Sequence, residues 1–450
     1  MKLTAIILAA GHGTRMHSRI PKVLHPLMGR PLLTYAIDAV KGLSTEKPVV
    51  VVGHEAEIVR SVIGDQVVFA LQEQQLGTGH AVLSARSHID PTSELIIVTF
   101  ADMPLLRAET LQKLVDLHRS SDAVLTMSSI VGDVPRGFGR IVRDAAGNVT
   151  AIVEEAVATP QQLAIREYNV SAYCFDAQWM WASLPKINPS PKGEYYLTDL
   201  VEIAVKEGQN IRSLVLDDPV EGMGINNRVH LAEATTALRN RINQELMLSG
   251  VTLVDPAMTY IEPGVQVGKD TVIWPNTYLH GNTVIGEECE IGPNTIIVDS
   301  RVGNQCKLFE STIEEAVIEN YVSMGPYCHL RKGAHLADGV HMGNFGEVKD
   351  SYLGPGVKMG HFSYIGNARI EQNVNIGAGT ITCNYDGENK NLTEIGENAF
   401  IGSDTMLVAP VKIGKNARTG AGSVVTKDVE ENTIVVGVPA RVIKRTEKRD

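Results

Sequence analysis

The sequence predicts an α/β domain with a Rossmann-like, mostly parallel sheet in the first half of the chain, followed by a parallel β-helix. In the first half, strand-like runs alternate with helical stretches, as in a parallel sheet covered by helices. In the second half, an aliphatic residue or Met recurs every six residues, which is the hexapeptide repeat of a β-helix. Residues 228–248 are polar and contain no Gly or Pro, which predicts a helix connecting the two.

In the first half, each predicted element is a short run with its own pattern. Ligands of such sheets bind at the carboxyl ends of the strands, so the residues that follow each strand are the first candidates for a site. Strands are expected at residues 4–9, Val49–Val52, Leu95–Phe100 and residues 123–127, and helices at Leu32–Lys41 and Ala108–Arg119.

In the second half, each six-residue unit is expected to form one strand and one turn. Three units close a triangular coil, and the inward side chains stack on those of the next coil. Periods of 3.6 or 2 do not fit. The period breaks between Ile376 and Ile395, where residues 377–387 are expected to loop out. The period is carried by Ile261, Val267, Ile273, Leu279, Ile285, Ile291, Ile297, Val302, Leu308, Ile313, Ile318, Met324, Leu330, Leu336, Met342, Val348, Leu353, Met359, Ile365, Ile370, Ile376, Ile395, Ile401, Leu407 and Ile413.

The length of 450 residues favours more than one domain. We expect a first domain at residues 1–227, a linker helix at residues 228–250 and a β-helix domain at residues 251–450. The net charge of -11 argues against nucleic acid as the main partner. Five dispersed cysteines indicate reduced thiols, and no apolar run is long enough to span a membrane, so a cytoplasmic location is expected.

A Gly-rich turn at residues 10–16 follows the first predicted strand. Successive N–H groups of such a turn can hold phosphate, and Lys22 is close enough in sequence to reach its oxygens. A plain tight turn followed by a solvated Lys explains these residues about as well. The turn is not a Walker A loop, since no Gly-Lys-Ser/Thr follows, nor a dinucleotide fingerprint, since Met16 replaces the third Gly.

Three motifs together carry a resemblance to a known family. They are residues 8–16 with Pro21 and Lys22, residues 75–81, and residues 193–199. With the hexapeptide half, nearly the whole chain resembles the bacterial bifunctional enzymes that are both N-acetylglucosamine-1-phosphate uridylyltransferase and glucosamine-1-phosphate N-acetyltransferase. The resemblance implies a left-handed β-helix, a homotrimer, Mg²⁺, and acetyl-CoA and UTP as co-substrates. The product would be UDP-N-acetylglucosamine, a precursor of bacterial cell-wall sugars.

For the first half, the resemblance implies a nucleotidylyltransferase domain and assigns its residues. Asp102, directly after a predicted strand, and Asn226 would hold Mg²⁺, with Asn227 as the alternative in register. Arg15 and Lys22 would neutralise phosphate charge. The residues implied to bind UTP or UDP-N-acetylglucosamine are Leu8, Ala9, Ala10, Gly11, Arg15, Lys22, Gln72, Gly77, Thr78, Asp102, Gly139, Glu154, Asn169 and Asn226, of which Gln72, Gly77 and Thr78 would read the uracil and Gly139, Glu154 and Asn169 would bind the sugar.

For the second half, the resemblance implies an acetyltransferase whose sites lie between neighbouring coils. His361 follows an inward Met, should point outward, and would be the general base that deprotonates the substrate ammonium. Glucosamine-1-phosphate would be bound by Arg331, Lys349, Tyr364 and Asn375, and acetyl-CoA by Ala378, Asn384, Tyr385, Ser403 and Ala421.

Three departures from the family pattern leave questions open. Glu154 and Glu155 are followed by Ala and Val, without the Lys-Asp pair that often follows the sugar-binding Glu, which leaves the exact sugar open. Phe100 and Ala101 stand where better-known members have Tyr and Gly, which leaves the choice between UTP and dTTP open. Gly437 stands where an Arg contacts the CoA phosphate, and Arg441 is the candidate replacement.

Three histidines at six-residue spacing, His329, His335 and His341, suggest a metal site, but this spacing puts them on three different faces of the coil. We therefore expect surface residues. Two other functions are alternatives to the bifunctional enzyme. One is a nucleotidylyltransferase whose β-helix only trimerises or regulates it, and the other is a non-enzymatic regulatory protein on the same folds. A scaffold would not require His361 and Tyr364, and a binding relic would not require Asp102.

Overall fold

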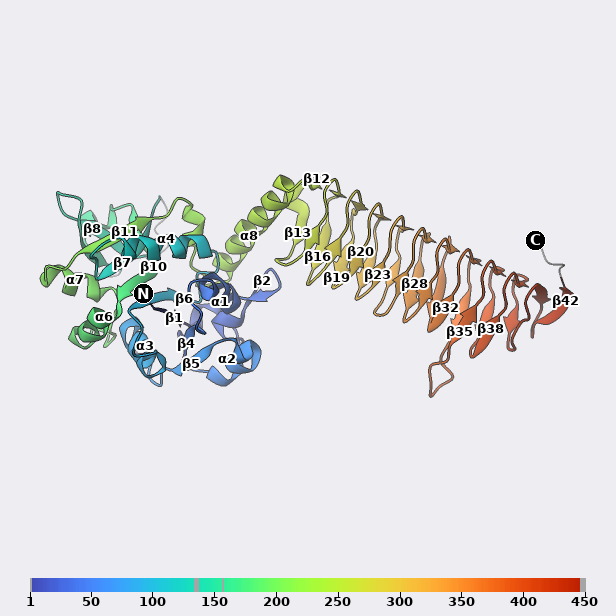
Figure 1. The fold of residues 1–450 in the computed structure, drawn as a ribbon, viewed down its shortest axis with the longest axis horizontal. Helices are drawn as coiled ribbons and strands as arrows, with labels where there is room; N and C mark the ends of the chain where they lie inside the picture. The colour runs from blue at the N-terminus through green and yellow to red at the C-terminus, as the bar shows by residue number, and fades with distance from the viewer. Residues whose placement is uncertain (1, 133–136, 156–157, 446–450) are drawn as a thin grey trace. The chain divides into compact units, whose positions relative to one another are not determined.

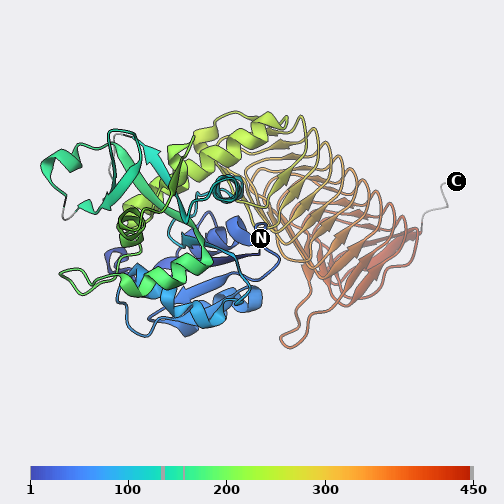
Figure 2. The same ribbon diagram turned by 60° about the vertical axis from the view of Figure 1, so that its left-hand side comes forward.

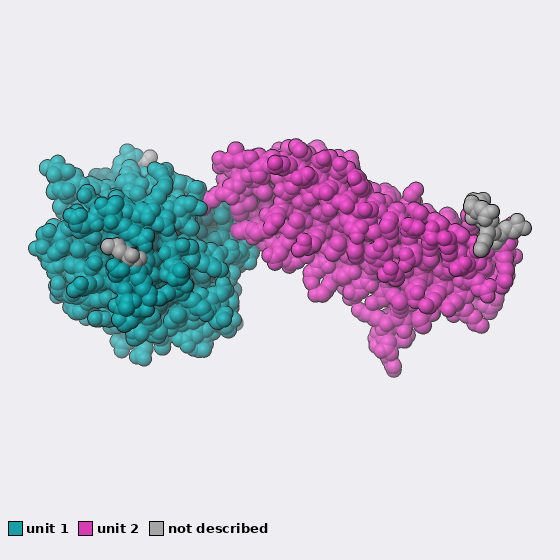
Figure 3. Space-filling model, viewed as in Figure 1, with its two compact units in different colours: residues 1–238 teal, residues 239–450 magenta. Residues whose placement is uncertain are grey.

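The computed structural model describes residues 2–132, 137–155 and 158–445. The chain divides into two compact units, residues 1–238 and residues 239–450 (Figure 1, Figure 3). The division falls inside helix α8 (Arg228–Leu248), which has the bounds predicted for the connecting helix. The domain boundaries expected at 227/228 and 250/251 therefore stay a prediction.

Unit 1 contains a sheet with strand β1 (Leu3–Leu8) near its centre, paired in parallel with β6 (Leu95–Phe100) and β4 (Val49–Val52). The strand order is β11-β7-β10-β6-β1-β4-β5, and β10 runs antiparallel to both of its neighbours. The other strands are β5 (Val68–Leu71), β7 (Leu125–Val131), β8 (Arg140–Arg143), β9 (Val149–Val153), β10 (Glu167–Asp176) and β11 (Ile211–Val215), with a small ribbon of β2 (Pro26–Leu27) and β3 (Arg30–Pro31).

Helices cover both faces of this sheet. All six side chains of β1 are buried, and the five apolar ones alternate between two hydrophobic clusters, as a strand between two helical layers requires. One cluster contains residues of α1 (Leu32–Lys41), α2 (Ala56–Ile63) and α4 (Ala108–Arg119). The other contains residues of α3 (Thr78–Ser84), α6 (Ala177–Ser183) and α7 (Asp199–Lys206). A short helix, α5 (Pro160–Leu163), precedes β10.

The predicted elements of the first half agree with the structure. The bounds of β4, β6, α1 and α4 are those predicted, whereas β1 begins and ends one residue earlier. The strand expected at residues 123–127 is β7, which runs further because its far end continues to pair with β10 and β11. The α/β fold class is confirmed.

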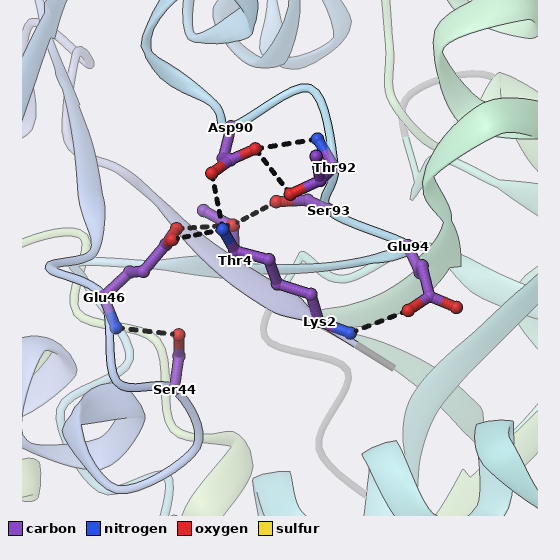
Figure 4. Close-up of polar contacts among 8 residues, drawn as sticks. All are labelled: Lys2, Thr4, Ser44, Glu46, Asp90, Thr92, Ser93 and Glu94. Atoms are coloured by element: carbon purple, nitrogen blue, oxygen red, sulfur yellow. Dashed lines mark hydrogen bonds and ion pairs between the residues drawn. The ribbon is translucent and has the colours of Figure 1, made fainter.

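A polar cluster holds the amino end of β1 (Figure 4). Lys2 Nζ lies 2.7 Å from Glu46 and 2.5 Å from Asp90, and its ammonium lowers the pKa of Asp90. Thr4 Oγ1 lies 2.7 Å from Ser93 Oγ. These contacts join β1 to the loops before β4 and β6, at the end of the sheet away from the Gly-rich turn.

Unit 2 is a stack of coils made of three parallel sheets (Figure 2). One sheet runs from β12 (Thr252–Leu253) to β39 (Arg418–Thr419), β41 (Thr433–Val436) and β42 (Arg441–Arg445), a second from β13 (Thr259–Ile261) to β40 (Val424–Val425), and a third from β14 (Gln266–Val267) to β38 (Val411–Ile413). Up to β40, successive strands of a sheet lie three strands apart in sequence, so each coil contributes one strand to each sheet. At the end of the first sheet, β39 pairs with β41, and β42 pairs antiparallel with β41.

The hexapeptide side chains point into these coils as predicted. From Ile261 to Ile413 they are buried, apart from Val267, which is partly buried against the same core. The β-helix prediction is confirmed. Helix α8 contributes to the first coil, because Asn243 Nδ2 donates to the carbonyl oxygens of Pro256 (2.9 Å) and Thr259 (3.1 Å), while Ile242 and Leu246 pack against the core.

The break lies between Ile376 and Ile395 as predicted, but the expectation that residues 377–387 loop out was wrong for residues 381–383, which form a strand. Thr382, six residues after Ile376, takes the next inward place in β34 (Ile381–Cys383) and is 1% exposed. Its hydroxyl accepts from Gly366 N–H at 2.8 Å and lies 3.0 Å from the Gly366 carbonyl oxygen, which satisfies a polar group inside the core. The segment that projects from the stack therefore lies between β34 and β35 (Thr393–Ile395) (Figure 1).

The three histidines lie on three sheets, as predicted. His329 is in β25 (His329–Leu330), His335 in β26 (His335–Leu336) and His341 in β27 (His341–Met342), each next to a buried aliphatic residue. His329 and His335 pair with Glu314 and Glu319, and His341 bonds to Ser323. In the described part of the chain, no helix combines the length and the apolar character that crossing a membrane would need.

Candidate functional site

A pocket of about 340 Å³ lies at the carboxyl ends of β1 and β6, the edge at which such sheets bind ligands. The Gly-rich turn forms one wall. The residues predicted for the nucleotide that line this pocket are Leu8, Ala9, Ala10, Gly11, Lys22, Gln72, Gly77, Thr78 and Asp102.

The Gly-rich turn packs closely on Lys22. Gly13 has φ +62°, and a Cβ there would lie 2.6 Å from Cβ of Lys22. Only Gly fits both the backbone angle and the close approach. The turn therefore holds the start of the Lys22 side chain while its ammonium reaches the pocket.

The Lys22 ammonium joins the two side chains predicted to hold Mg²⁺. Its Nζ lies 2.6 Å from Oδ2 of Asp102 and 3.1 Å from Oδ1 of Asn226. Arg15 donates to the same Asn226 oxygen at 2.9 Å. A main-chain hydrogen bond holds Asp102 and Asn226 next to each other, because the N–H of Ile225 donates to the carbonyl of Asp102 at 2.8 Å.

These residues fit a magnesium ion. Asp102 and Asn226 offer carboxylate and amide oxygens, and both already bind one cation, the Lys22 ammonium. Asn227 faces elsewhere, since its Oδ1 accepts from the N–H of His230 at the start of α8. Among the described residues no group of three His, Cys, Asp or Glu side chains could hold a metal, so substrate phosphates and water would have to complete the coordination of Mg²⁺ at this pair.

The second and third sequence motifs bind each other at one side of the pocket. The N–H of Gly79 donates to the carbonyl of Tyr195 at 2.8 Å, and the N–H of Leu197 donates to Thr78 Oγ1 at 2.9 Å. Gly77 has φ +98°, and a Cβ there would lie 2.5 Å from the Tyr195 oxygen. This pairing brings Glu194 and Tyr196 to the pocket wall, where sequence reasoning had assigned them no role.

The residues predicted for the sugar lie together beside this pocket. Glu154 lines a second hollow of about 310 Å³ with Tyr196, which lines both. A Cβ on Gly139 would lie 3.5 Å from Glu154 Oε1, and the Gly139 carbonyl accepts from the N–H of Asn169 at 3.0 Å. Asn169 is 4% exposed and donates to the Tyr173 hydroxyl at 2.6 Å.

Two carboxyl groups near the residues predicted for the sugar have raised pKa values. Burial, and then the charge of Asp199, raises the pKa of Glu154. Burial, and then the charge of Glu202, raises the pKa of Asp199 to about 6, with Lys206 opposing this. Asp199 begins α7 and closes the third sequence motif.

On the β-helix, His361 and three predicted CoA residues form one column. Met359, Ile376, Ile401 and Thr419 are stacked inward residues of successive coils. His361, Ala378, Ser403 and Ala421 each follow one of these by two residues. Backbone bonds connect the column, since the carbonyl of Ala378 accepts from Asp404 N–H and that of Ser403 accepts from Gly422 N–H. His361 is exposed, as predicted.

The other predicted residues of this site lie on either side of the column. Asn375 is in β33 (Asn375–Ile376), beside Lys358 of the preceding coil. Tyr364 is in β31 (Ser363–Gly366), and a Cβ on Gly366 would meet both its hydroxyl and Asn384 Nδ2. Asn384 is 8% exposed and donates to Asn367 Oδ1 at 2.7 Å, whereas Tyr385 in the projecting segment is 62% exposed.

A cluster of cations lies on neighbouring coils of the same sheet. Arg331 follows β25 and Lys349 ends β28 (Gly346–Lys349), which pairs with β25 and with β31. The neighbouring Lys390, from the projecting segment, lowers the pKa of Lys349, and Arg331 adds to this effect. Sequence reasoning missed Lys390, because only the fold of the projecting segment returns it to this sheet. Three cations so placed suit an anion such as a phosphate group.

Gly437 occupies a turn that disfavours Arg. Its φ of +99° is one that side chains rarely adopt. Arg441 lies beyond the turn, at the start of the exposed strand β42. The absence of Arg at position 437 therefore goes together with a backbone conformation that favours Gly.

Comparisons with known proteins cover both units. A MobA-like NTP transferase domain matches residues 5–159, and the bacterial transferase hexapeptide repeat matches residues 259–308 and 392–427. A bifunctional protein GlmU of Heliobacterium modesticaldum is 47% identical over 97% of this chain and 95% of its own length. This chain belongs to the GlmU family. GlmU proteins of Geobacillus sp. (46% identical, 99% of this chain, 97% of the relative) and Streptococcus agalactiae (44%, 98% and 96%) extend the likeness.

Membership of the GlmU family agrees with the resemblance read from the sequence motifs. The likeness runs through both units, so the GlmU relatives share the α/β half as well as the hexapeptide half. The roles assigned to individual residues remain predictions, and the geometry above is what supports them.

Proposed function

We propose that this chain makes UDP-N-acetylglucosamine by two reactions, one in each unit. The observation that carries this conclusion is membership of the bifunctional GlmU family over nearly the full length of the chain. It is supported by residues predicted for the nucleotide that line one pocket of unit 1, and by residues predicted for acetyl transfer that lie on neighbouring coils of unit 2. The β-helix unit transfers acetyl from acetyl-CoA to glucosamine-1-phosphate. The α/β unit then transfers uridylyl from UTP to N-acetylglucosamine-1-phosphate and releases pyrophosphate.

Uridylyl transfer needs positioning and positive charge. A phosphate oxygen of the sugar phosphate attacks the α-phosphorus of UTP, and the bond to pyrophosphate breaks. Lys22, Arg15 and the N–H groups of the Gly-rich turn neutralise the phosphate oxygens, while Glu154 and Asn169 orient the sugar. Mg²⁺, held by Asp102 and Asn226, would supply further positive charge at the phosphates.

Acetyl transfer needs a base and an anion clamp. Arg331, Lys349 and Lys390 hold the phosphate of glucosamine-1-phosphate. Neutral His361 takes a proton from the substrate ammonium, and the free amine attacks the thioester carbon. A C–N bond forms, the C–S bond breaks, and the CoA thiolate leaves and takes up a proton. The CoA chain lies along the column that contains Ala378, Ser403 and Ala421, with Asn384 and Tyr385 at its side.

Two further statements stay proposals. The chain assembles as a homotrimer through its β-helix, as the resemblance implies, and sedimentation equilibrium would test this against the chain mass of 48.8 kDa. It works in the cytoplasm with small-molecule substrates.

The test is product formation in two coupled assays on one preparation. Thiol release from acetyl-CoA must require glucosamine-1-phosphate, and pyrophosphate release must require both UTP and N-acetylglucosamine-1-phosphate. Pyrophosphate release without thiol release would make the β-helix a scaffold. Failure of both assays with a folded preparation would favour a regulatory protein.

A further inference from the structure

We propose that His80 is a positioning residue that fixes the side-chain amide of Gln72, so that the pocket selects a nucleobase with a hydrogen-bond donor at N3. The chemical class is uracil or thymine as opposed to cytosine. This inference rests on the proposed uridylyl transfer and names the feature of the chain that reads the base.

Gln72 is placed to contact a ligand. It follows β5 directly, and its N–H donates to the carbonyl of Val52 at 2.8 Å, which continues the pairing of β5 with β4. Its side chain lines the nucleotide pocket although the residue is only 3% exposed. A buried amide at a pocket wall keeps one orientation if its own hydrogen bonds decide which atom faces the ligand.

The side-chain nitrogen of Gln72, and not its oxygen, makes the hydrogen bonds to the protein. Nε2 of Gln72 lies 3.1 Å from the carbonyl oxygen of Gly77 and 3.0 Å from Nδ1 of His80. A carbonyl oxygen only accepts, so the atom facing Gly77 is the amide nitrogen. Nε2 has two N–H groups, and the second points to His80, whose Nδ1 must then be the unprotonated ring nitrogen. Oε1 is left as the group that a ligand can meet.

With Oε1 of Gln72 facing the ligand, this side of the nucleotide pocket offers a hydrogen-bond acceptor. Uracil attached to ribose has a single donor, N3–H, between two carbonyl groups, and thymine shares it. Cytosine has a lone pair at N3, which an acceptor repels, so mispairing leaves two polar groups unsatisfied. The 5-methyl group of thymine lies away from N3, so Gln72 separates UTP from CTP and not from dTTP.

His80 can hold the amide because its own position is fixed. It lies in α3, whose start is tied to the third sequence motif through the bonds of Gly79 to Tyr195 and of Thr78 to Leu197. Gly77 supplies the other acceptor from the residue before the helix. Without Nδ1, one N–H of Gln72 loses its partner, and the flipped amide, with Nε2 toward the base, becomes competitive.

The experiment compares His80→Leu with His80→Asn in the full chain. Leu removes the acceptor, whereas the Asn side-chain oxygen falls near the place of Nδ1. We would measure pyrophosphate release with UTP, dTTP and CTP. We expect His80→Leu to lower the UTP-to-CTP ratio of kcat/KM by about five- to tenfold, mainly through KM, as expected for loss of one neutral hydrogen bond. His80→Asn should restore most of the ratio, and the dTTP-to-UTP ratio should stay unchanged in both.

The outcomes separate this inference from the proposed function. An inactive wild-type protein with every nucleotide would remove the proposed uridylyl transfer itself. Active wild-type protein with an unchanged UTP-to-CTP ratio in His80→Leu would overturn the role of His80 alone. An equal loss with UTP and CTP would also overturn it, since that is the result of a purely structural defect. Circular dichroism and thermal unfolding report folding of each variant, because thiol release comes from the other unit and would not detect misfolding around His80.

Discussion

Nζ of Lys22 lies 2.6 Å from Oδ2 of Asp102 and 3.1 Å from Oδ1 of Asn226, so the ammonium joins the two side chains that are predicted to hold Mg²⁺. The Lys22 side chain is 12% exposed, so this ion pair is shielded from solvent. A Mg²⁺ ion held by Asp102 and Asn226, as proposed above, would compete with the ammonium for the same oxygens. Nucleotide phosphates would relieve this competition, because they offer Lys22 another partner.

The Lys22→Met variant should bind Mn²⁺ more tightly than the wild type when no nucleotide is present. Removing a charge-assisted bond frees Asp102, so we expect affinity to rise about tenfold or more. Uridylyl transfer should fall by about 10²-fold or more, since a cation at the phosphates is lost. Electron paramagnetic resonance of free Mn²⁺ measures the affinity. Lys41→Met, at the exposed end of α1, is the matched control, and an unchanged Mn²⁺ affinity in Lys22→Met would contradict the competition.

The His361→Ala variant should lose acetyl transfer by about 10²- to 10⁴-fold, the usual range for a general base, and keep uridylyl transfer. Thiol and pyrophosphate release measured on one preparation give both rates. The control is His280→Ala. His280 is another outward imidazole, lies several coils away from His361 and pairs with Glu262, so its loss should leave both activities intact. Loss of both activities in a folded His361→Ala protein would argue against separate sites.

Lys390→Met should raise KM for glucosamine-1-phosphate by roughly tenfold, because one charge-assisted bond to phosphate is lost. Its like charge also lowers the pKa of Lys349, so this substitution returns Lys349 toward its ordinary pKa. Steady-state kinetics of thiol release measure the change, with exposed Lys427→Met as the control. An unchanged KM would exclude Lys390 from the anion clamp.

Asp199→Asn should stabilise unit 1 near pH 7.5 and have little effect near pH 4. The folded state raises the pKa of Asp199 from 3.8 to about 6, so the native protein binds the extra proton between these values. Stability contributed by this group is full below pH 4 and falls as the pH rises to about 6. Asn removes the penalty, by at most about 1 kcal/mol after solvent screening is allowed for.

Thermal unfolding of Asp199→Asn at pH 4 and pH 7.5 measures this difference. Asp116→Asn, an exposed carboxylate of α4, is the control. Equal shifts of the melting temperature at both pH values would mean that ionisation of Asp199 is not responsible.

Thr382→Val should destabilise the β-helix by about 1–3 kcal/mol although Val is the more hydrophobic residue. The change leaves the N–H of Gly366 without the hydroxyl that now accepts from it at 2.8 Å. Denaturant unfolding of the full chain detects the loss, and Thr312→Val, a half-exposed position of β22 (Thr312–Glu314), serves as the control. If Thr382→Val were as stable as wild type, the inward hydroxyl would have no structural role.

The repeating apolar positions of this chain could be predicted from the sequence, whereas individual contacts between residues distant in sequence could not. The six-residue pattern predicted the buried stack from Ile261 to Ile376, because burial acts on every coil alike. Thr382 broke the apolar pattern although it keeps the same place, since its hydroxyl is satisfied by a neighbour that sequence spacing does not reveal. In the same way, the choice between Asn226 and Asn227 depended on which one caps α8.

The nucleotide site followed the same division. The Gly-rich turn and Asp102 were predicted because they follow strands that end at one edge of the sheet, whereas Gln72, Gly77 and Thr78 were assigned from the family resemblance alone. Tyr196 lies in the third motif, but its place at the pocket wall depends on the pairing of that motif with residues 75–81. On the β-helix, Lys390 reaches Lys349 only through the fold of the projecting segment and has no local signal of its own.

The column that begins at His361 and ends at Ala421 has a fixed length. Strands of neighbouring coils lie about 4.8 Å apart, so the four positions span roughly 14 Å along the stack. In the proposed acetyl transfer, a donor that meets Ala421 with one end would have to be extended over this length to present its acyl carbon at His361. Short thioesters would reach the base without the far contacts, so the number of coils in the column would set the length of donor that the protein uses well.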